Sequence, residues 1–174
     1  MGPMRGTVSR IVESWGARTH LNVAGYLWVA GMLGLLAALE ANKIGLYLVP
    51  PFGATLTILL LLPDAAIAQP YSVIAGSVIG AGVGTITSLF GQGIGMAVVA
   101  AAVAFGVISF LRAYHPPAVA LAIYPILLRP GHWFPLFVVL PFSAAAVISA
   151  AILSRLVRNW PSYPRPLTKP EKKK

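Results

Sequence analysis

The residues best suited to chemistry in this chain are an arginine and a histidine next to two consecutive prolines, in Arg112 and His115-Pro116-Pro117. An imidazole can bind an anion or carry a proton because its charge changes near neutral pH. A guanidinium attracts anions at any physiological pH. Both groups lie between strongly apolar stretches, so the sequence predicts polar side chains inside a membrane protein, where they indicate a functional site.

The two prolines predict a break between helices. Proline lacks an N–H and its ring clashes with the preceding turn, but it fits the first turn of a new helix. We therefore expect one helix to end near Tyr114 and a short second helix to begin at Pro116 or Pro117. The N-terminus of that helix would offer free N–H groups and a partial positive charge, which together favour an anion.

A second Pro-Pro pair, Pro50-Pro51, stands earlier in the chain. After each pair comes an apolar run of about a dozen residues, fewer than the roughly 20 that a bilayer crossing needs. Longer apolar stretches lie at about 21–39, 71–90, 94–114 and 134–153. The sequence thus predicts an all-α membrane protein with four full transmembrane helices and two short Pro-Pro-initiated re-entrant half-helices, arranged as an internal two-fold repeat.

Two arrangements of this repeat are open. Half-helices that enter from the same face give parallel repeats, whereas short segments that cross give three spans per half and inverted repeats. We prefer the re-entrant, parallel arrangement, because a dozen residues cannot cover the hydrocarbon thickness. Gly76, Gly80 and Gly84 predict a close-packing face on their helix, and Pro141 predicts a kink in the last span.

Composition supports a membrane protein, since 57% of residues are hydrophobic and only 10% are charged, against about a quarter in soluble domains. The net charge of +9 comes from basic residues clustered at the two ends of the chain. Basic flanks predict cytoplasmic termini and leave no basic surface for nucleic acid. We expect a basic amphipathic segment over 1–20, a transmembrane domain over 21–154 with repeats at about 21–90 and 94–154, and a basic cytoplasmic tail over 155–174.

The expected function follows from the two half-helix N-termini, which would converge near the membrane midplane on a small anion. Gly53 would allow close approach of backbone, and Thr55 and Thr57 could donate their hydroxyls. One histidine without a nucleophile or carboxylate partner is too little for catalysis, so we expect no enzyme. The chain has no cysteine and its histidines lack metal-ligand spacing, so we expect no metal or cofactor. The residues expected to bind the anion are Pro51, Phe52, Gly53, Ala54, Thr55, Arg112, His115, Pro116, Pro117 and Ala118.

Other roles stay open for the two basic residues. Arg112 could extend to the lipid headgroups or pair with Glu40 or Asp64. His115 could be a neutral group that satisfies the broken helix. For the whole chain, the alternatives to a carrier are an anion channel without coupling and a structural or accessory subunit of the membrane.

Three pieces of this sequence, at their spacings, resemble the HPP family of integral membrane proteins: Pro50-Pro51-Phe52-Gly53-Ala54, Ala68-Gln69-Pro70 and His115-Pro116-Pro117. The resemblance covers about 21–153 and departs at Ala118, where relatives often carry glycine. The family is generally described with four membrane spans, and members in plastids and cyanobacteria are described as nitrite transporters. The resemblance therefore implies transport of a small monovalent inorganic anion, nitrite above all. We expect a multi-pass protein of a bacterial inner or plasma membrane, and the small size of the bundle suggests a homo-oligomer.

Overall fold

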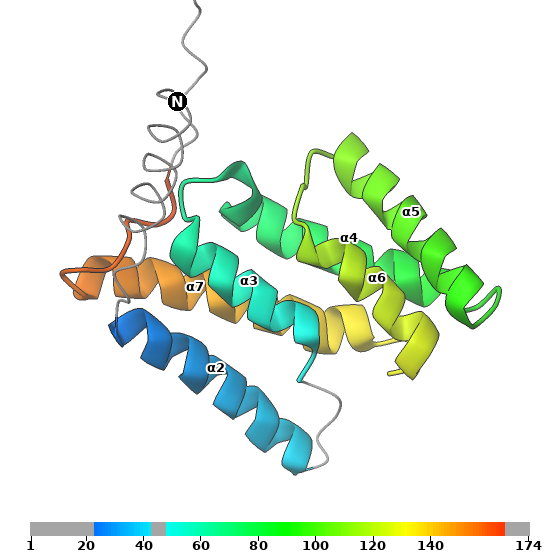
Figure 1. The fold of residues 1–174 in the computed structure, drawn as a ribbon, viewed down its shortest axis with the longest axis horizontal. Coiled ribbons are helices and arrows are strands. Elements are labelled where there is room, and N and C mark those ends of the chain that lie inside the picture. Colours follow the sequence, from blue (N-terminus) through cyan, green and yellow to red (C-terminus); the bar gives the residue numbers. More distant parts are fainter. Residues whose placement is uncertain (1–22, 43–47, 166–174) are drawn as a thin grey trace, which may run out of the picture.

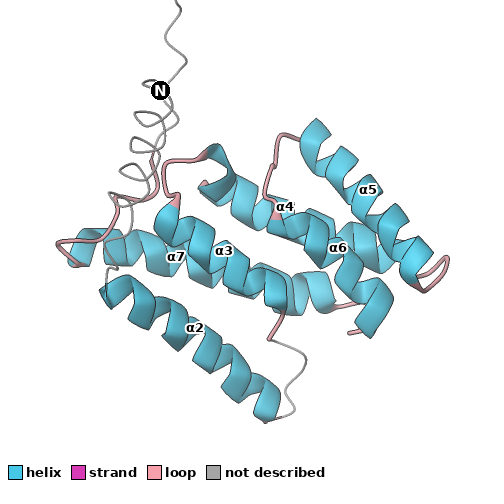
Figure 2. Ribbon diagram, viewed as in Figure 1, coloured by secondary structure: helices cyan, strands magenta, loops and turns pink. Residues whose placement is uncertain are grey.

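The computed structural model describes residues 23–42 and 48–165, and every regular element in them is a helix (Figure 2). The predicted segment over 1–20 and the end of the tail lie outside these residues. A 3₁₀ turn, η1, precedes α4, and a π-helical segment, η2, leads into α7. The elements are α2 (Val23–Ala41), α3 (Pro50–Leu61), η1 (Ala66–Ala68), α4 (Pro70–Thr87), α5 (Ile94–Phe110), α6 (Pro117–Leu128), η2 (Pro135–Val139) and α7 (Leu140–Leu156).

Three helical stretches in the described residues are long and apolar enough to cross a membrane, namely α2, α4 and η2 together with α7. Helix α5, with 17 residues, is shorter than the predicted span over 94–114. It ends early because Arg112 takes the left-handed conformation, with φ of 54°. Helices α3 and α6 have 12 residues each, or about 18 Å at 1.5 Å per residue, against roughly 30 Å of hydrocarbon. The fourth full span is therefore not confirmed.

Prolines begin α3, α4 and α6, and the starts of α3 and α6 are those that the sequence predicts. Helix α3 begins at Pro50, α4 at Pro70 and α6 at Pro117. Their fixed φ suits a helix start and their missing N–H costs nothing there. The irregularity expected around Pro141 takes the form of the π-helical segment just before it. A π turn is a recognised way to accommodate an interrupted hydrogen-bond ladder.

Both short helices return the chain to the side from which the preceding helix set out. The loop after α3 lies at the end of the bundle where α7 finishes, because Asp64 forms an ion pair of 2.7 Å with Arg165. The turn after α6 lies at the other end, because Arg129 Nε donates to Gln92 Oε1 in the turn between α4 and α5. Hereafter the C-terminal end means the end with residues 62–69 and 157–165, and the opposite end means that with residues 88–93 and 129–134. Helices α3 and α6 thus run in opposite directions (Figure 1).

The opposite directions of α3 and α6 agree with the inverted alternative, and the re-entrant, parallel arrangement that we preferred is not confirmed. The preference rested on a 12-residue helix being too short to cross alone. In the structure, α3 and α6 begin near the middle of the molecule and run toward different ends (Figure 1). Each short helix can therefore reach one end without covering the full thickness by itself.

Helix α6 is seated directly on α4 through the predicted glycine face, which the structure confirms. A Cβ added at Gly80 would meet the carbonyl of Ala118, and one added at Gly84 would meet that of Ala122. Gly76 faces the carbonyl of Ala113 in the same way. The residue numbers of the contacting positions rise together along both segments, so α4 and α6 run in the same direction. This glycine seam, Gly76, Gly80 and Gly84, permits backbone-to-backbone packing that larger residues would prevent.

Helix α3 is seated on α7 by large side chains. The rings of Phe52 and Phe142 stack with centroids 3.8 Å apart, and Phe52 is buried. Helix α2 covers the outside of this pair, where Gly25 lies against Leu60 of α3. Trp28 of α2 also donates a hydrogen bond of 3.0 Å to Ser149 of α7. Aromatic and hydroxyl side chains therefore join the first half of the chain to the last helix.

Candidate functional site

The most buried titratable side chain in the described residues is His115, with no exposed surface at all. It lies between α5 and α6, just before the prolines that start α6. Its Nε2 is 2.9 Å from the Oγ1 of Thr55 on α3, and its Nδ1 is 2.9 Å from the carbonyl oxygen of Ile67 in η1. One side chain thus joins the start of α6 to the second turn of α3 and to the loop before α4. We call this set of three residues the junction.

Hydrogen-bond chemistry restricts the proton positions at the junction. A carbonyl only accepts, so Nδ1 of His115 carries the proton that is donated to Ile67. In the neutral ring, Nε2 then accepts from the hydroxyl of Thr55. In the doubly protonated ring, Nε2 donates to that hydroxyl instead, and Thr55 can donate to the carbonyl of Pro51, 3.2 Å away. The same heavy-atom geometry serves both charge states, so the junction can hold or release a proton without moving apart.

The backbone at the start of α6 is more fully paired than we expected. Pro116 and Pro117 have no N–H, the N–H of Ala118 donates to the carbonyl of His115 at 2.9 Å, and that of Val119 donates to Pro116 at 3.2 Å. At α3, the N–H of Phe52 donates to the carbonyl of Val49 at 2.9 Å. The start of α6 therefore contributes partial positive charge near His115, whereas the hydrogen-bond donors of the junction are the side chains of His115 and Thr55.

Arg112 lies away from the junction on the surface of the described chain. Its N–H donates to the carbonyl of Ser109, and the N–H of Ala113 donates to that of Ile108, which together close the end of α5 in a Schellman motif. The left-handed position in this motif normally belongs to glycine. The side chain makes no hydrogen bond or ion pair within the described residues, and Asp64, one partner we considered, pairs with Arg165 instead.

The predicted residues of α3 divide between two faces. Phe52 and Thr55 are buried. Gly53 lies beside open space, since nothing comes within 4 Å of an added Cβ, and Ala54 is exposed. On α6, Pro117 and Ala118 are buried while Pro116 is exposed. Of the ten predicted residues, the structure joins His115 and Thr55 by a direct side-chain contact.

Sequence reasoning missed two groups that shape the junction. The first is the carbonyl of Ile67, which no sequence pattern marks, because every residue has a carbonyl. The second is Gly76, where an added Cβ would lie 3.1 Å from the Cβ of His115. The glycine face did give a signal here, because small residues spaced by four mark a surface that a neighbour approaches closely.

The segment after α7 holds the loop that carries Ile67. The hydroxyl of Tyr163 donates 2.8 Å to the carbonyl of Ala68, and that of Ser154 donates 2.7 Å to the carbonyl of Tyr163. Burial raises the pKa of the Tyr163 phenol above its ordinary value, so it remains a neutral donor. The ion pair of Asp64 with Arg165 also joins the segment after α7 to the loop after α3. The C-terminal segment therefore fixes η1 against the junction.

These features define the class of protein: a helical integral membrane protein with two inverted halves that meet at a buried polar junction. Residues 16–164 match the family model described as HPP, transmembrane region. The chain therefore belongs to the HPP family. No curated protein and no solved structure matches it. No group of three or more metal-ligating side chains occurs within residues 23–42 and 48–165.

Proposed function

We propose that this protein carries a small monovalent anion across a membrane, with nitrite as the substrate. The observation that carries the proposal is the contact of His115, just before α6, with Thr55 in the second turn of α3, a buried pair of polar side chains. Polar and ionisable side chains within an apolar membrane bundle are rare and commonly mark a path for ions or substrate. The family resemblance supplies nitrite as the specific anion.

The electrostatics at the junction suit an anion. His115 directly precedes α6, and the N-terminus of that helix carries partial positive charge. Inverted halves whose short helices begin near the middle of the molecule are a recurring way to build such a site in transporters. His115 adds a full positive charge when protonated, and Thr55 adds a hydroxyl donor.

The proposed cycle uses both hydrogen-bonding states of His115. With Nε2 protonated, the ring and the Thr55 hydroxyl can donate to an anion that enters between them. When the anion leaves together with the proton, Thr55 donates to the neutral ring again and the junction closes. Nitrite then moves unchanged and no catalytic step is needed. Such a cycle couples one proton to one anion, so a proton gradient would drive uptake.

The test is flux into proteoliposomes of nitrite, nitrate, formate and chloride, with and without a proton gradient. The variants are His115→Ala, Thr55→Val and the matched control Thr57→Val, an exposed threonine on the same helix. We expect selective nitrite flux that the first two substitutions lower by about tenfold or more, equivalent to about 1.4 kcal/mol, and that the control preserves. Saturable, gradient-driven flux indicates a carrier, whereas unsaturated current indicates a channel. Absence of flux for all four anions would contradict the proposal.

A further inference from the structure

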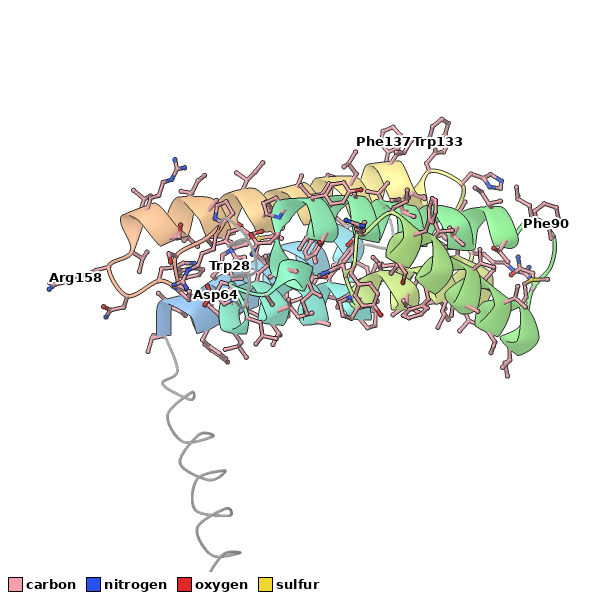
Figure 3. The ribbon with its side chains drawn as sticks, turned by 90° about the horizontal axis from the view of Figure 1, so that it is seen from above. Trp28, Asp64, Phe90, Trp133, Phe137 and Arg158 are labelled. Atoms are coloured by element: carbon pink, nitrogen blue, oxygen red, sulfur yellow. The ribbon has the colours of Figure 1, made fainter. Side chains whose placement is uncertain are left out.

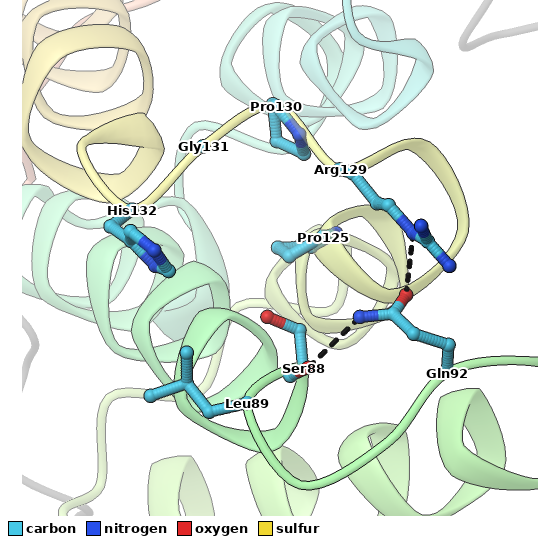
Figure 4. A pocket seen from close by; sticks show the side chains of 8 residues that line it. All are labelled: Ser88, Leu89, Gln92, Pro125, Arg129, Pro130, Gly131 and His132. Carbon is cyan, nitrogen blue, oxygen red and sulfur yellow. Dashed lines mark hydrogen bonds between the residues drawn. The ribbon is translucent and has the colours of Figure 1, made fainter.

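A pocket of about 240 Å³ with both polar and apolar walls lies at the opposite end of the bundle, away from the junction (Figure 4). The C-terminal turns of α4 and α6 and the two turns that follow them enclose it. Arg129 stands on one side of it and His132 on the other (Figure 4). The residues that line the pocket are Ser88, Leu89, Gln92, Pro125, Arg129, Pro130, Gly131 and His132.

The guanidinium of Arg129 is held in place by a short chain of hydrogen bonds. Its Nε donates to Oε1 of Gln92 at 3.3 Å, and Nε2 of Gln92 donates to the carbonyl of Ser88 at 2.9 Å. In the described residues, the two Nη groups of Arg129 have no hydrogen-bond or ion-pair partner. A guanidinium fixed through Nε keeps these two donors free for an oxyanion.

The backbone at Arg129 ends α6 in the left-handed conformation, as that at Arg112 does after α5. Its φ is 50°, in the left-handed region where glycine or asparagine is usual. A residue with a Cβ pays about 1 kcal/mol or more in this conformation. Gly131 follows two positions later with φ of 96°, so the chain turns sharply around the pocket.

The helix ends around the pocket largely offset one another. Helices α4 and α6 end here with partial negative charge, while α5 and η2 begin here with partial positive charge. Arg129 therefore makes the electrostatic potential in the pocket positive. No acidic side chain lines it.

Size and surroundings indicate which oxyanion fits. The volume is well above the roughly 30 Å³ of one water, and Leu89, Pro125 and Pro130 add apolar walls beside the polar groups. Large exposed aromatic side chains, Phe90 and Trp133, stand at the same end (Figure 3). Exposed aromatics are typical of the level of the lipid headgroups.

We propose that this pocket binds a phosphate group through Arg129, positioned by Gln92, and that the phosphate is carried by an anionic phospholipid headgroup or is free in solution. The Nη groups would donate to two phosphate oxygens, and the apolar walls would contact the glycerol carbons of a lipid. Because the site is separate from the junction, the proposal does not rest on anion transport.

The experiment measures ligand-induced thermal stabilisation of the full chain in detergent, with short-chain phosphatidylglycerol, short-chain phosphatidylcholine and inorganic phosphate as probes. Arg129→Gly removes the guanidinium and gives the left-handed position the residue it prefers, so this variant should fold. Arg158→Gln, an exposed arginine at the C-terminal end (Figure 3), is the matched control for loss of one charge. Gln92→Ala tests the positioning contact.

We expect phosphatidylglycerol to stabilise wild type and Arg158→Gln, with at least about tenfold weaker binding to Arg129→Gly and an intermediate loss in Gln92→Ala. Stabilisation by phosphatidylglycerol beyond that by inorganic phosphate identifies a lipid as the source, and equal effects identify free phosphate. Phosphatidylcholine should stabilise less, because its choline offsets the phosphate charge. Stabilisation that survives in Arg129→Gly, or none by either phosphate probe, would overturn the site.

Discussion

Helices α3 and α6 occupy corresponding places in the two halves and have the same length, but they are held by different kinds of packing. Helix α6 lies on the glycine seam of α4, so main chain meets main chain. Helix α3 lies on α7 through the stacked rings of Phe52 and Phe142. The residue that stands at the place of Phe52 in the second half is the buried Ala118, which faces Gly80. One half-helix is therefore fixed by its backbone and the other by side chains that can change rotamer.

The difference teaches where movement is cheap. Where backbone packs on backbone, no side chain can change rotamer to relieve a displacement. Helices α4 and α6 should therefore move as one body. Side-chain packing can rearrange, so α3 is the better candidate to move when the junction opens. Thr55, on α3, would then leave His115, which stays with α6.

The largest effect is expected from filling the seam. Gly80→Leu would push a side chain into the carbonyl of Ala118, where only backbone could yield, so we expect no folded protein to be recovered. Overpacking costs about 1–3 kcal/mol even where side chains can adjust. The control Gly82→Leu lies on the same helix, where nothing is within 4 Å of an added Cβ, and should fold. Size-exclusion profiles in detergent compare the two variants. Equal recovery of folded protein would contradict the claim that α6 is held by backbone packing on the glycine seam.

Removing an aromatic ring from the contact between α3 and α7 should lower the stability strongly and still leave a folded protein. Phe52→Ala deletes a buried aromatic side chain, which costs about 3–5 kcal/mol in a protein core. We expect a folded protein whose thermal midpoint falls by several degrees. Phe142→Ala removes the same contact from the other side, so the double variant should lose less than the sum of the single losses. Strict additivity would show that the two rings do not support each other.

Breaking the junction should cost less. Thr55→Val keeps the shape of the side chain and removes its hydroxyl, which leaves Nε2 of His115 without a partner. A buried polar group that loses its partner costs about 1–3 kcal/mol. Thr57→Val removes an exposed hydroxyl that bonds to the carbonyl of Gly53, and its effect should stay within about 0.5 kcal/mol. Reversible unfolding would measure the free energy of unfolding of both variants. An equal loss in the two would show that the hydrogen bond of Thr55 with His115 does not contribute more to stability than an exposed one.

The smallest effect concerns Arg112. Arg112→Gly places the preferred residue at the left-handed end of α5, so the free energy of unfolding should rise by about 1 kcal/mol. Arg155→Gly, in the last turn of α7, should instead lower it by about 1 kcal/mol, because glycine is a poor residue within a helix. A clear loss of stability in Arg112→Gly would reveal that the guanidinium, and not only the backbone, holds this end of the helix.

Local features of the fold could be predicted from the sequence, because prolines and glycines act on their own surroundings. Pro50 and Pro117 begin short helices, and the face of Gly76, Gly80 and Gly84 packs closely, as predicted. The relative direction of the halves could not be predicted. Charge fixes only which side the termini share, and both arrangements place the termini together.

The candidate site could be predicted only in outline. His115 stands out because it is polar and lies at the break. Its partner is 60 positions away, and nothing in an apolar stretch that carries both Thr55 and Thr57 tells which hydroxyl faces inward. Helix α3 is apolar on all sides, so no periodic pattern separates a buried face from an exposed one.

The central claim is that the halves are inverted, and single-cysteine labelling tests it most directly because the chain has no cysteine of its own. Asp64→Cys, Arg158→Cys, Gln92→Cys and His132→Cys place one thiol each at exposed positions, for reaction with a membrane-impermeant maleimide from one side of sealed vesicles. The account predicts that positions 64 and 158 react from one side and positions 92 and 132 from the other. Labelling of positions 64 and 132 from one side and of 92 and 158 from the other would mean parallel halves and would contradict it.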